Sequence, residues 1–193
     1  MLNTAVGHIA MIAAASALYL PPSPQARTRP TAPEKFSVNA AVNTGAGGSA
    51  GTFTIAVNRY NTEKERALLA DALEHGGYPG FLPRLRQASV VGHLTFGDKT
   101  WNIRYAFQQP NEKGRRIVIV TDQPVYFVGG GQTDAKPREG YGVAVVQIEV
   151  DDVGLGKGTM AAAARVKPGG PGGVQIDDYA DKPIDLVTVR RMQ

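Results

Sequence analysis

The chain has 193 residues and a formal net charge of +4, from 21 Lys plus Arg against 17 Asp plus Glu. It contains no Cys, which excludes a disulfide, a thiolate nucleophile and a Cys-ligated metal. With 3 His residues and no Cys, we expect no metal site and no cofactor. The basic residues are scattered rather than gathered in a stripe, so we expect no nucleic-acid partner.

The beginning of the chain is typical of an export signal. Residues 9–20 form a twelve-residue apolar run, whereas a membrane-spanning helix needs about 20 apolar residues. We predict a signal peptide over 1–26, an exported protein (periplasmic or secreted) and no stable membrane span. Pro24 fits poorly before a cut after Ala26, and no Lys or Arg precedes the run. A cut after Ala17, an uncleaved anchor and a buried helix therefore remain alternatives.

Residues 27–50 predict a flexible linker. Pro, Ala, Gly, Thr and Asn dominate the segment, and Phe36, Val38 and Val42 are its candidates for packing. Such a segment cannot bury enough apolar area to offset its ordering entropy. We expect at most one short extended piece at 36–42, followed by a single β-rich domain over 51–193.

The domain is expected to open with a strand and two helical stretches. Residues 52–58 alternate between apolar and polar, which predicts a strand. Thr62 followed by Glu65 makes a capping box, and the glycine pair at 76–77 ends this first helix. A second, shorter helical stretch follows from Tyr78, so we predict an N-terminal helical pair.

The rest of the chain keeps a period of two, which predicts strands joined by short turns. The expected strands cover residues 90–96, 101–108, 116–121, 124–128, 141–150, 158–167, 173–177 and 184–190. Short turns favour antiparallel hairpins, and the lack of intervening helices excludes a doubly wound sheet. The predicted class is α+β: a mostly antiparallel β meander, curled into a half-barrel or barrel, with the helical pair at an end or a face.

The strand at 101–108 places aromatic side chains on one face by strict alternation. These rings would either fill a core or line a cavity, since a barrel of about eight strands can hold one small ligand. An arginine on this strand, or alternatively Arg115 or Arg116 on the next, could meet an anionic head group. The candidate ligand-binding residues are Trp101, Arg104, Tyr105 and Phe107.

Three glycine-rich stretches approximate known motifs. Residues 47–51 fit G-x-S-x-G, residues 45–50 approximate the dinucleotide fingerprint, and residues 154–159 superficially resemble a phosphate loop. Each motif needs a strand before it and a helix after it, and none of the three has both. We therefore favour a linker for the first two and a hairpin turn for the third.

The remaining candidates for chemistry are histidines and carboxylates. His75 falls at a predicted helix end, where it interacts with the helix dipole. His93 falls within a strand, as a hydrogen-bonded residue or, alternatively, a general base. The acidic residues near the carboxyl end favour a solvated surface, with a weak cation site or a glycosidase pair as alternatives. They are Asp177, Asp178, Asp181 and Asp185. We assign no catalytic residue.

Four segments together resemble a family of uncharacterised secreted bacterial proteins. They are RYNTEKERALLADAL, VGHLTFGDKTWNIRYAFQQP, GRRIVIVTDQPV and IDDYADKPIDLVTVRR, and the resemblance spans roughly residues 52–191. That family has no assigned activity, so it supplies no functional residues. The resemblance implies export and a single domain.

These observations favour an exported, non-enzymatic domain that binds a small apolar or amphipathic ligand or an envelope protein. One alternative is a hydrolase that uses His93 with acidic partners from elsewhere in the fold. The other is an interaction module that pairs with its partner through a sheet edge.

Overall fold

The computed structural model describes residues 32–44, 47–126, 138–180 and 182–192. The predicted signal peptide and Asp181 lie outside the described residues. The elements are β1 (Glu34–Thr44), β2 (Gly47–Val57), α1 (Glu63–Gln87), β3 (Gly92–Phe96), β4 (Lys99–Asn111), β5 (Gly114–Thr121), β6 (Val143–Asp151), β7 (Leu155–Pro168), β8 (Val174–Tyr179) and β9 (Ile184–Met192).

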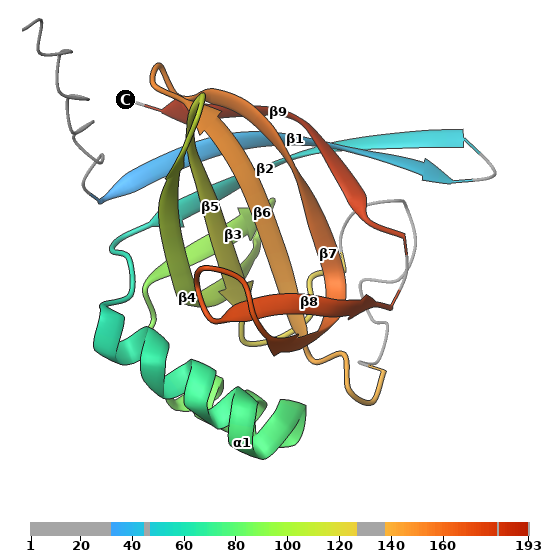
Figure 1. Cartoon of the computed structure of the whole chain (residues 1–193). Helices are drawn as coiled ribbons and strands as arrows, with labels where there is room; N and C mark the ends of the chain where they lie inside the picture. Colours follow the sequence, from blue (N-terminus) through green and yellow to red (C-terminus); the bar gives the residue numbers. More distant parts are fainter. Residues whose placement is uncertain (1–31, 45–46, 127–137, 181, 193) are drawn as a thin grey trace, which may run out of the picture.

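The strands form a closed antiparallel barrel. Their order is β6-β5-β4-β3-β2-β1-β9-β7-β8, and an additional pairing of β6 with β7 joins eight of them into a ring (Figure 1). β8 stands outside this ring and pairs with the C-terminal part of β7. The predicted class, a mostly antiparallel α+β barrel, is confirmed.

The expected linker is wrong from residue 34 onward, because β1 and the first residues of β2 lie within 27–50. Phe36, Val38 and Ala40 are fully buried and belong to the barrel interior. β1 pairs with β2 on one side and with β9 on the other, so it closes the ring. A composition poor in large apolar residues pointed to a linker, but Phe36, Val38 and Ala40 alternate along β1 and their side chains fit the interior.

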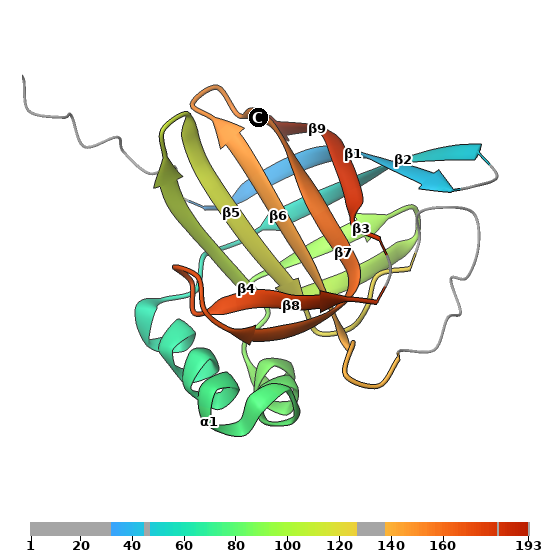
Figure 2. The same cartoon turned by 45° about the vertical axis from the view of Figure 1, so that its right-hand side comes forward.

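One helix stands where a helical pair was expected, so the pair is not confirmed. α1 begins with the expected capping box: the Thr62 side chain accepts a hydrogen bond from the Glu65 N–H, and the Glu65 carboxylate accepts one from the Thr62 N–H at 2.8 Å. The helix continues through the glycine pair, with a kink at Gly77, where φ is 60° and ψ is −163°. Figure 2 shows the two parts of α1 folded back beneath the barrel.

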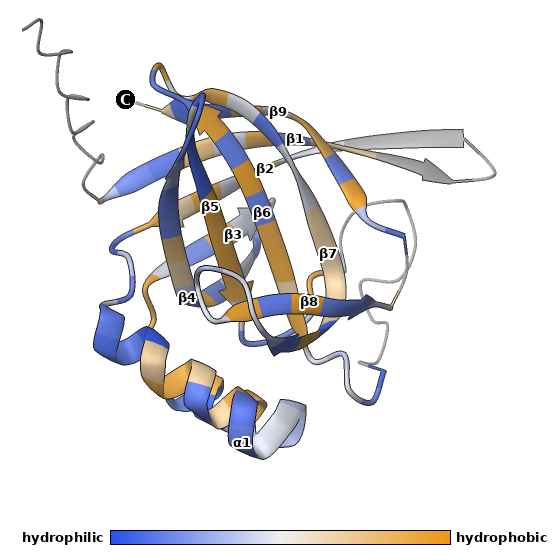
Figure 3. Cartoon of the chain, viewed as in Figure 1, coloured by the Kyte–Doolittle hydropathy of each residue, from blue (hydrophilic) through white to orange (hydrophobic). Residues whose placement is uncertain are grey.

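Two separate apolar clusters hold the fold together. The first fills the barrel and takes side chains from all eight strands of the ring, among them Phe36, Phe53, Trp101 and Met160. The second lies between α1 and the outside of the barrel, and includes Leu73, Phe81, Tyr105, Val145 and Val166. The first half of β6 is apolar on both faces, so Val143 and Val145 join the outer cluster while Ala144 and Val146 join the inner one. Figure 3 shows this change along β6, from a continuous apolar stretch to an alternation of apolar and polar residues.

A β-bulge in β4 decides which cluster each aromatic ring joins. Ile103 is opposite Thr121 and Tyr105 is opposite Val120, so Arg104 is an extra residue without a partner on β5. Strict alternation therefore stops at Arg104. Trp101 and Ile103 point into the barrel, whereas Tyr105 and Phe107 pack in the outer cluster. The expectation that these aromatic residues share one face is wrong.

Candidate functional site

The four predicted ligand-binding residues are not brought together. Trp101, which is 8% exposed, is packed inside the barrel. The Tyr105 hydroxyl, in the outer cluster, donates a hydrogen bond to the Gly172 carbonyl at 2.6 Å. The guanidinium of Arg66 lies 4.6 Å from the centre of the Phe107 ring. The three rings therefore stabilise two different parts of the fold instead of lining one cavity.

Arg104, the fourth candidate, joins the end of α1 to the end of β5. Its Nε donates to Asp122 Oδ2 at 2.9 Å, and its Nη1 donates to the Ala88 carbonyl at 2.6 Å. Ala88 is the C-cap of the helix, so Arg104 also offsets the negative end of the helix dipole. Because its charge is already paired within the fold, Arg104 is a structural residue in this geometry.

A buried ion pair closes the upper end of the barrel, which is the end where β4 turns into β5 and β6 into β7 in Figure 1. Arg115 donates to both oxygens of Glu34, at 2.8 and 2.6 Å. The Tyr60 hydroxyl donates to Glu34 at 2.6 Å, and Arg191 lies 3.7 Å from the same carboxylate. Gln108 accepts a further hydrogen bond from Arg115 at 2.7 Å. We call Glu34, Tyr60, Gln108, Arg115 and Arg191 the barrel plug.

Burial and hydrogen bonding act in opposite directions on the acid of the plug. Burial alone would raise the pKa of the Glu34 carboxyl, but the hydrogen bonds from Arg115 and Tyr60 outweigh it and hold this pKa below its ordinary value. Burial and the neighbouring Glu34 carboxylate raise the pKa of Tyr60 above its ordinary value. At neutral pH the plug therefore contains a carboxylate, two guanidinium groups and a protonated phenol.

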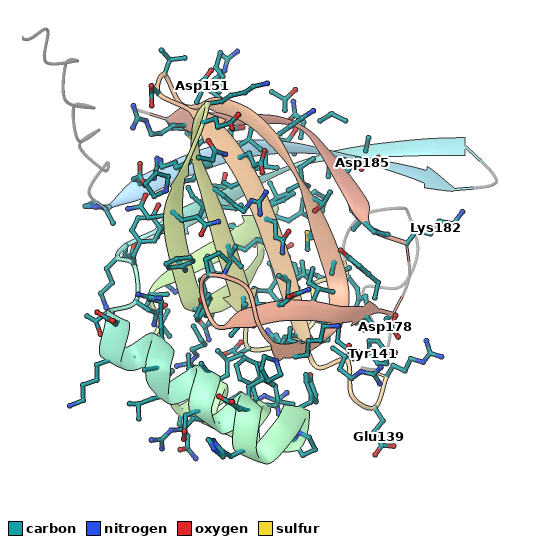
Figure 4. The ribbon with its side chains drawn as sticks, in the orientation of Figure 1. Glu139, Tyr141, Asp151, Asp178, Lys182 and Asp185 are labelled. Atoms are coloured by element: carbon teal, nitrogen blue, oxygen red, sulfur yellow. The ribbon has the colours of Figure 1, made fainter. Side chains whose placement is uncertain are left out.

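The same end of the barrel carries a groove of about 640 Å³ on its outside. We call it the outer groove. It is lined by Asn111, Glu112, Lys113, Arg116, Glu149, Val150, Asp151, Leu155, Gly156, Lys157 and Val187. These residues come from the β4–β5 turn and from β5, β6, β7 and β9. Figure 4 labels Asp151 at the point where β6 turns into β7.

The charged side chains of the groove follow the pairing of the strands. Arg116 is opposite Glu149, which in turn is opposite Lys157. Arg116 and Glu149 form an ion pair at 2.6 Å. Asp151 Oδ1 accepts hydrogen bonds from the Val153 and Leu155 N–H groups of its own turn.

Two lysines and two apolar side chains of the outer groove are exposed. In the part of the chain that the structure describes, Lys113 and Lys157 form no ion pair. Leu155 is 45% exposed and Val187 is 58% exposed. Val187 is pushed outward by an irregularity in β9, since Leu186 is opposite Ala40 and Thr188 is opposite Asn39, which leaves Val187 without a partner on β1.

Sequence reasoning missed both the barrel plug and the outer groove. Glu34 fell in the expected linker, and it lies 81 positions from Arg115. Lys157 fell in the stretch that superficially resembled a phosphate loop; the structure places it on β7, with a hairpin turn before it as favoured and no helix after it. Strict alternation would have placed Arg115 and Ile117 on one face, but no short-range pattern shows what lies opposite them.

His75 and His93 do not lie in an arrangement typical of a catalytic base. His75 Nδ1 lies 3.1 Å from Asp71 Oδ1 on the exposed face of α1. His93 lies on β3, opposite Ala56 and Asn102. Within the described ranges, no hydrogen bond or ion pair joins His93 to a carboxylate, so the hydrolase alternative has no partner for its base.

The acidic residues near the carboxyl end are divided between two places. Asp177 on β8 pairs with Arg165 at 2.9 Å, and Asp178 accepts a hydrogen bond from the Tyr141 hydroxyl. Figure 4 shows Asp178 beside Tyr141, whereas Asp185 lies apart on β9. No group of three or more metal-ligating side chains occurs among the residues described here.

No family model, no curated protein and no solved structure matches this chain. Over the described residues, the structure contains no helix with the length and apolarity that crossing a membrane requires.

Proposed function

We propose that this chain is an exported, non-enzymatic binding domain that holds a small amphipathic anion in the outer groove. One observation carries the proposal: a concave site of about 640 Å³ combines two exposed apolar side chains with two lysines that form no ion pair with any described residue. Ligand sites typically enclose about 300–1,000 Å³ and place a few polar groups beside apolar surface.

The barrel interior is a poor alternative site for a ligand, which supports the assignment to the outer groove. Its cluster includes Phe36, Phe53, Trp101 and Met160, and the barrel plug occupies its upper end. A ligand inside would have to displace large side chains, each of which contributes roughly 1.5–3 kcal/mol through its burial. The outer groove needs no such displacement.

The outer groove has three basic and three acidic side chains in its lining, so an anion would bind at the positions of its lysines and not through a net positive charge. Of its acidic side chains, Glu149 is neutralised by Arg116, and Asp151 is held by the N–H groups of its turn. The third, Glu112, lies at the β4–β5 turn next to Lys113. Lys113 and Lys157 can therefore receive a carboxylate or a phosphate.

The apolar part of the ligand would rest on Leu155 and Val187. Both side chains line the same groove as the two lysines, so one molecule can contact an ammonium group and the apolar surface together. The ligand class is then a carboxylate or a phosphate carried on an aliphatic or aromatic stem. A simple anion would lack the apolar contact, and an uncharged alcohol would lack the ionic one.

Calorimetric titration with octanoate, octyl phosphate, octanol and octylamine tests this ligand class. We expect binding of both anions and weaker or no binding of octanol and octylamine. The double variant Lys113→Gln/Lys157→Gln should weaken octanoate binding by about 3- to 30-fold, from two exposed ionic contacts of up to about 1 kcal/mol each.

The matched control is Lys99→Gln/Lys182→Gln, which removes the same charge away from the outer groove. It should bind octanoate like the unmodified protein. Equal binding of octanoate and octanol, or equal losses in both double variants, would contradict the proposed groove. So would the absence of heat with every probe at millimolar concentration.

Export is supported by the apolar run at 9–20 and by the prolines that follow it. Cell fractionation combined with N-terminal sequencing of the purified protein tests this part. We expect a mature chain that begins at residue 27, found outside the cytoplasm. An intact chain retained in the cytoplasm would contradict export without affecting the groove.

A further inference from the structure

Half of β2 has a free backbone edge. β1 covers one side of β2 from Gly47 to Val57, whereas β3 covers the other side from Thr54 to Val57. Among the described residues, no strand pairs with positions 47–52 on this second side. Figures 1 and 2 show the β1–β2 hairpin projecting from the barrel, so another chain can reach this edge.

The composition of this edge is unusual for an exposed strand. Residues 47–52 read Gly-Gly-Ser-Ala-Gly-Thr, with no charge and no proline. Exposed edges are normally protected by charges, prolines or bulges, because unpaired N–H and C=O groups are a template for another strand. Glycine within a strand often marks a place where another backbone approaches closely. The segment that approximated nucleotide-binding and nucleophile motifs is therefore an unprotected edge.

Another free edge among the described residues, that of β8, differs in its charges and in its regularity. β8 carries Asp177 and Asp178, and its pairing with β7 is interrupted by an irregularity between Arg165 and Val166. Two copies joined through β8 would bring four carboxylates onto one short ladder, and like charges opposite each other are destabilising. β8 therefore has the protection that residues 47–52 lack.

We propose that two copies of this chain associate through β2, whose free edges pair antiparallel across a two-fold axis at Ala50. Ala50 is then opposite Ala50 of the second copy, and Gly48 is opposite Thr52. No charged residue faces another along this ladder, which is what a self-complementary interface requires. The two projecting hairpins form one four-stranded sheet. This interface does not depend on the ligand proposed for the outer groove.

Sedimentation equilibrium of the full chain, together with charged variants at the axis, tests the interface. The unmodified protein should show twice its chain mass. Ala50→Lys and Ala50→Glu should each be monomeric, because each places two like charges directly opposite each other. An equimolar mixture of the two variants should recover the dimer. Gln175→Lys, which adds a charge to β8, should remain dimeric.

Cysteine cross-linking locates the contact, since the natural chain contains no Cys. Residues opposite each other in an antiparallel pair have Cα atoms about 4.5–5.5 Å apart, which a disulfide can bridge. Ala50→Cys should form a covalent dimer under mild oxidation, whereas Gln175→Cys should not. A monomer at every concentration, dimers in both charged variants, or cross-linking through position 175 would each overturn the proposal. Circular dichroism should show the same fold in all variants.

Discussion

Removing the arginine of the barrel plug should destabilise the protein strongly. The side chains of Arg115 and Glu34 are 7% and 4% exposed. In Arg115→Met the Glu34 carboxylate stays buried but loses two charge-assisted hydrogen bonds, and keeps the Tyr60 hydroxyl and the more distant Arg191. Breaking one side of a buried pair costs about 3–5 kcal/mol. Whole domains unfold with a free energy of roughly 5–15 kcal/mol, so this one substitution should remove a large part of the free energy of unfolding.

A double-mutant cycle separates the ion pair from the packing around it. Glu34→Met should cost a similar amount, because it leaves the Arg115 cation buried. The double variant Glu34→Met/Arg115→Met removes both charges and should lie within about 2 kcal/mol of the unmodified protein, since apolar replacement of a buried pair is often neutral or stabilising. The coupling free energy should therefore exceed about 3 kcal/mol. Urea unfolding at neutral pH measures it, provided that the slope with denaturant stays constant.

The outer face of β5, the strand that carries Arg115, provides the control. Arg116 and Glu149 form an ion pair with the same 2.6 Å contact, but their side chains are 46% and 47% exposed. The corresponding cycle with Arg116→Met and Glu149→Met should give a coupling below about 1 kcal/mol. Equal couplings for the buried and the exposed pair would refute the reasoning that burial makes the plug important.

The plug should also make stability depend on pH. The pKa of the Glu34 carboxyl is lowered in the folded protein from its ordinary value of 4.5, so the folded state favours the charged form. This contribution is fully present above pH 4.5 and is lost as the pH falls through the lowered pKa. Stability measured between pH 7 and pH 3 should therefore decrease less in Glu34→Met/Arg115→Met than in the unmodified protein.

Two further predictions concern the helix and the outer cluster. Gly77→Ala should lower the free energy of unfolding by about 1–3 kcal/mol, because φ of 60° with ψ of −163° is essentially restricted to glycine. Gly76 has open space around it, so Gly76→Ala should raise the free energy of unfolding by about 0.5–1 kcal/mol. Equal effects in urea unfolding would contradict the kink. Tyr105→Phe should cost about 1–2 kcal/mol, since the Gly172 carbonyl loses its 2.6 Å donor. An unchanged melting temperature would show that this hydrogen bond contributes nothing.

Short-range patterns predicted the elements well where one pattern covered the whole element. The capping box of Thr62 and Glu65 requires two residues three positions apart, and the structure forms it as expected. The alternating strands and their short turns led to an antiparallel barrel, because hairpin pairing follows from local turn chemistry. In β1 the alternation was present, but the small residues between its apolar positions obscured it.

The candidate site could not be predicted, because it depends on pairing between distant strands. The bulge at Arg104 is defined by how β4 pairs with β5, and the alternating sequence of β4 alone gives no indication of it. The contact between Glu34 and Arg115 likewise appears only when the barrel is closed. A pattern within one segment shows which residues share a face, provided that no residue is inserted. It cannot show which residues another strand brings opposite.

The two bulges give the barrel its two different outer surfaces. At Arg104, β4 changes from filling the barrel with Trp101 to supporting α1 with Tyr105, so the helix gains an apolar platform without any loss of packing inside. At the irregularity in β9, the side chain of Val187 lies on the outside of the barrel, whereas Leu186 and Val189 are buried. A strictly alternating barrel would have neither feature. The support of α1 by Tyr105 and the unpaired position of Val187 on β9 therefore follow from strand register, which is how a closed and filled barrel can still present apolar side chains on its outside.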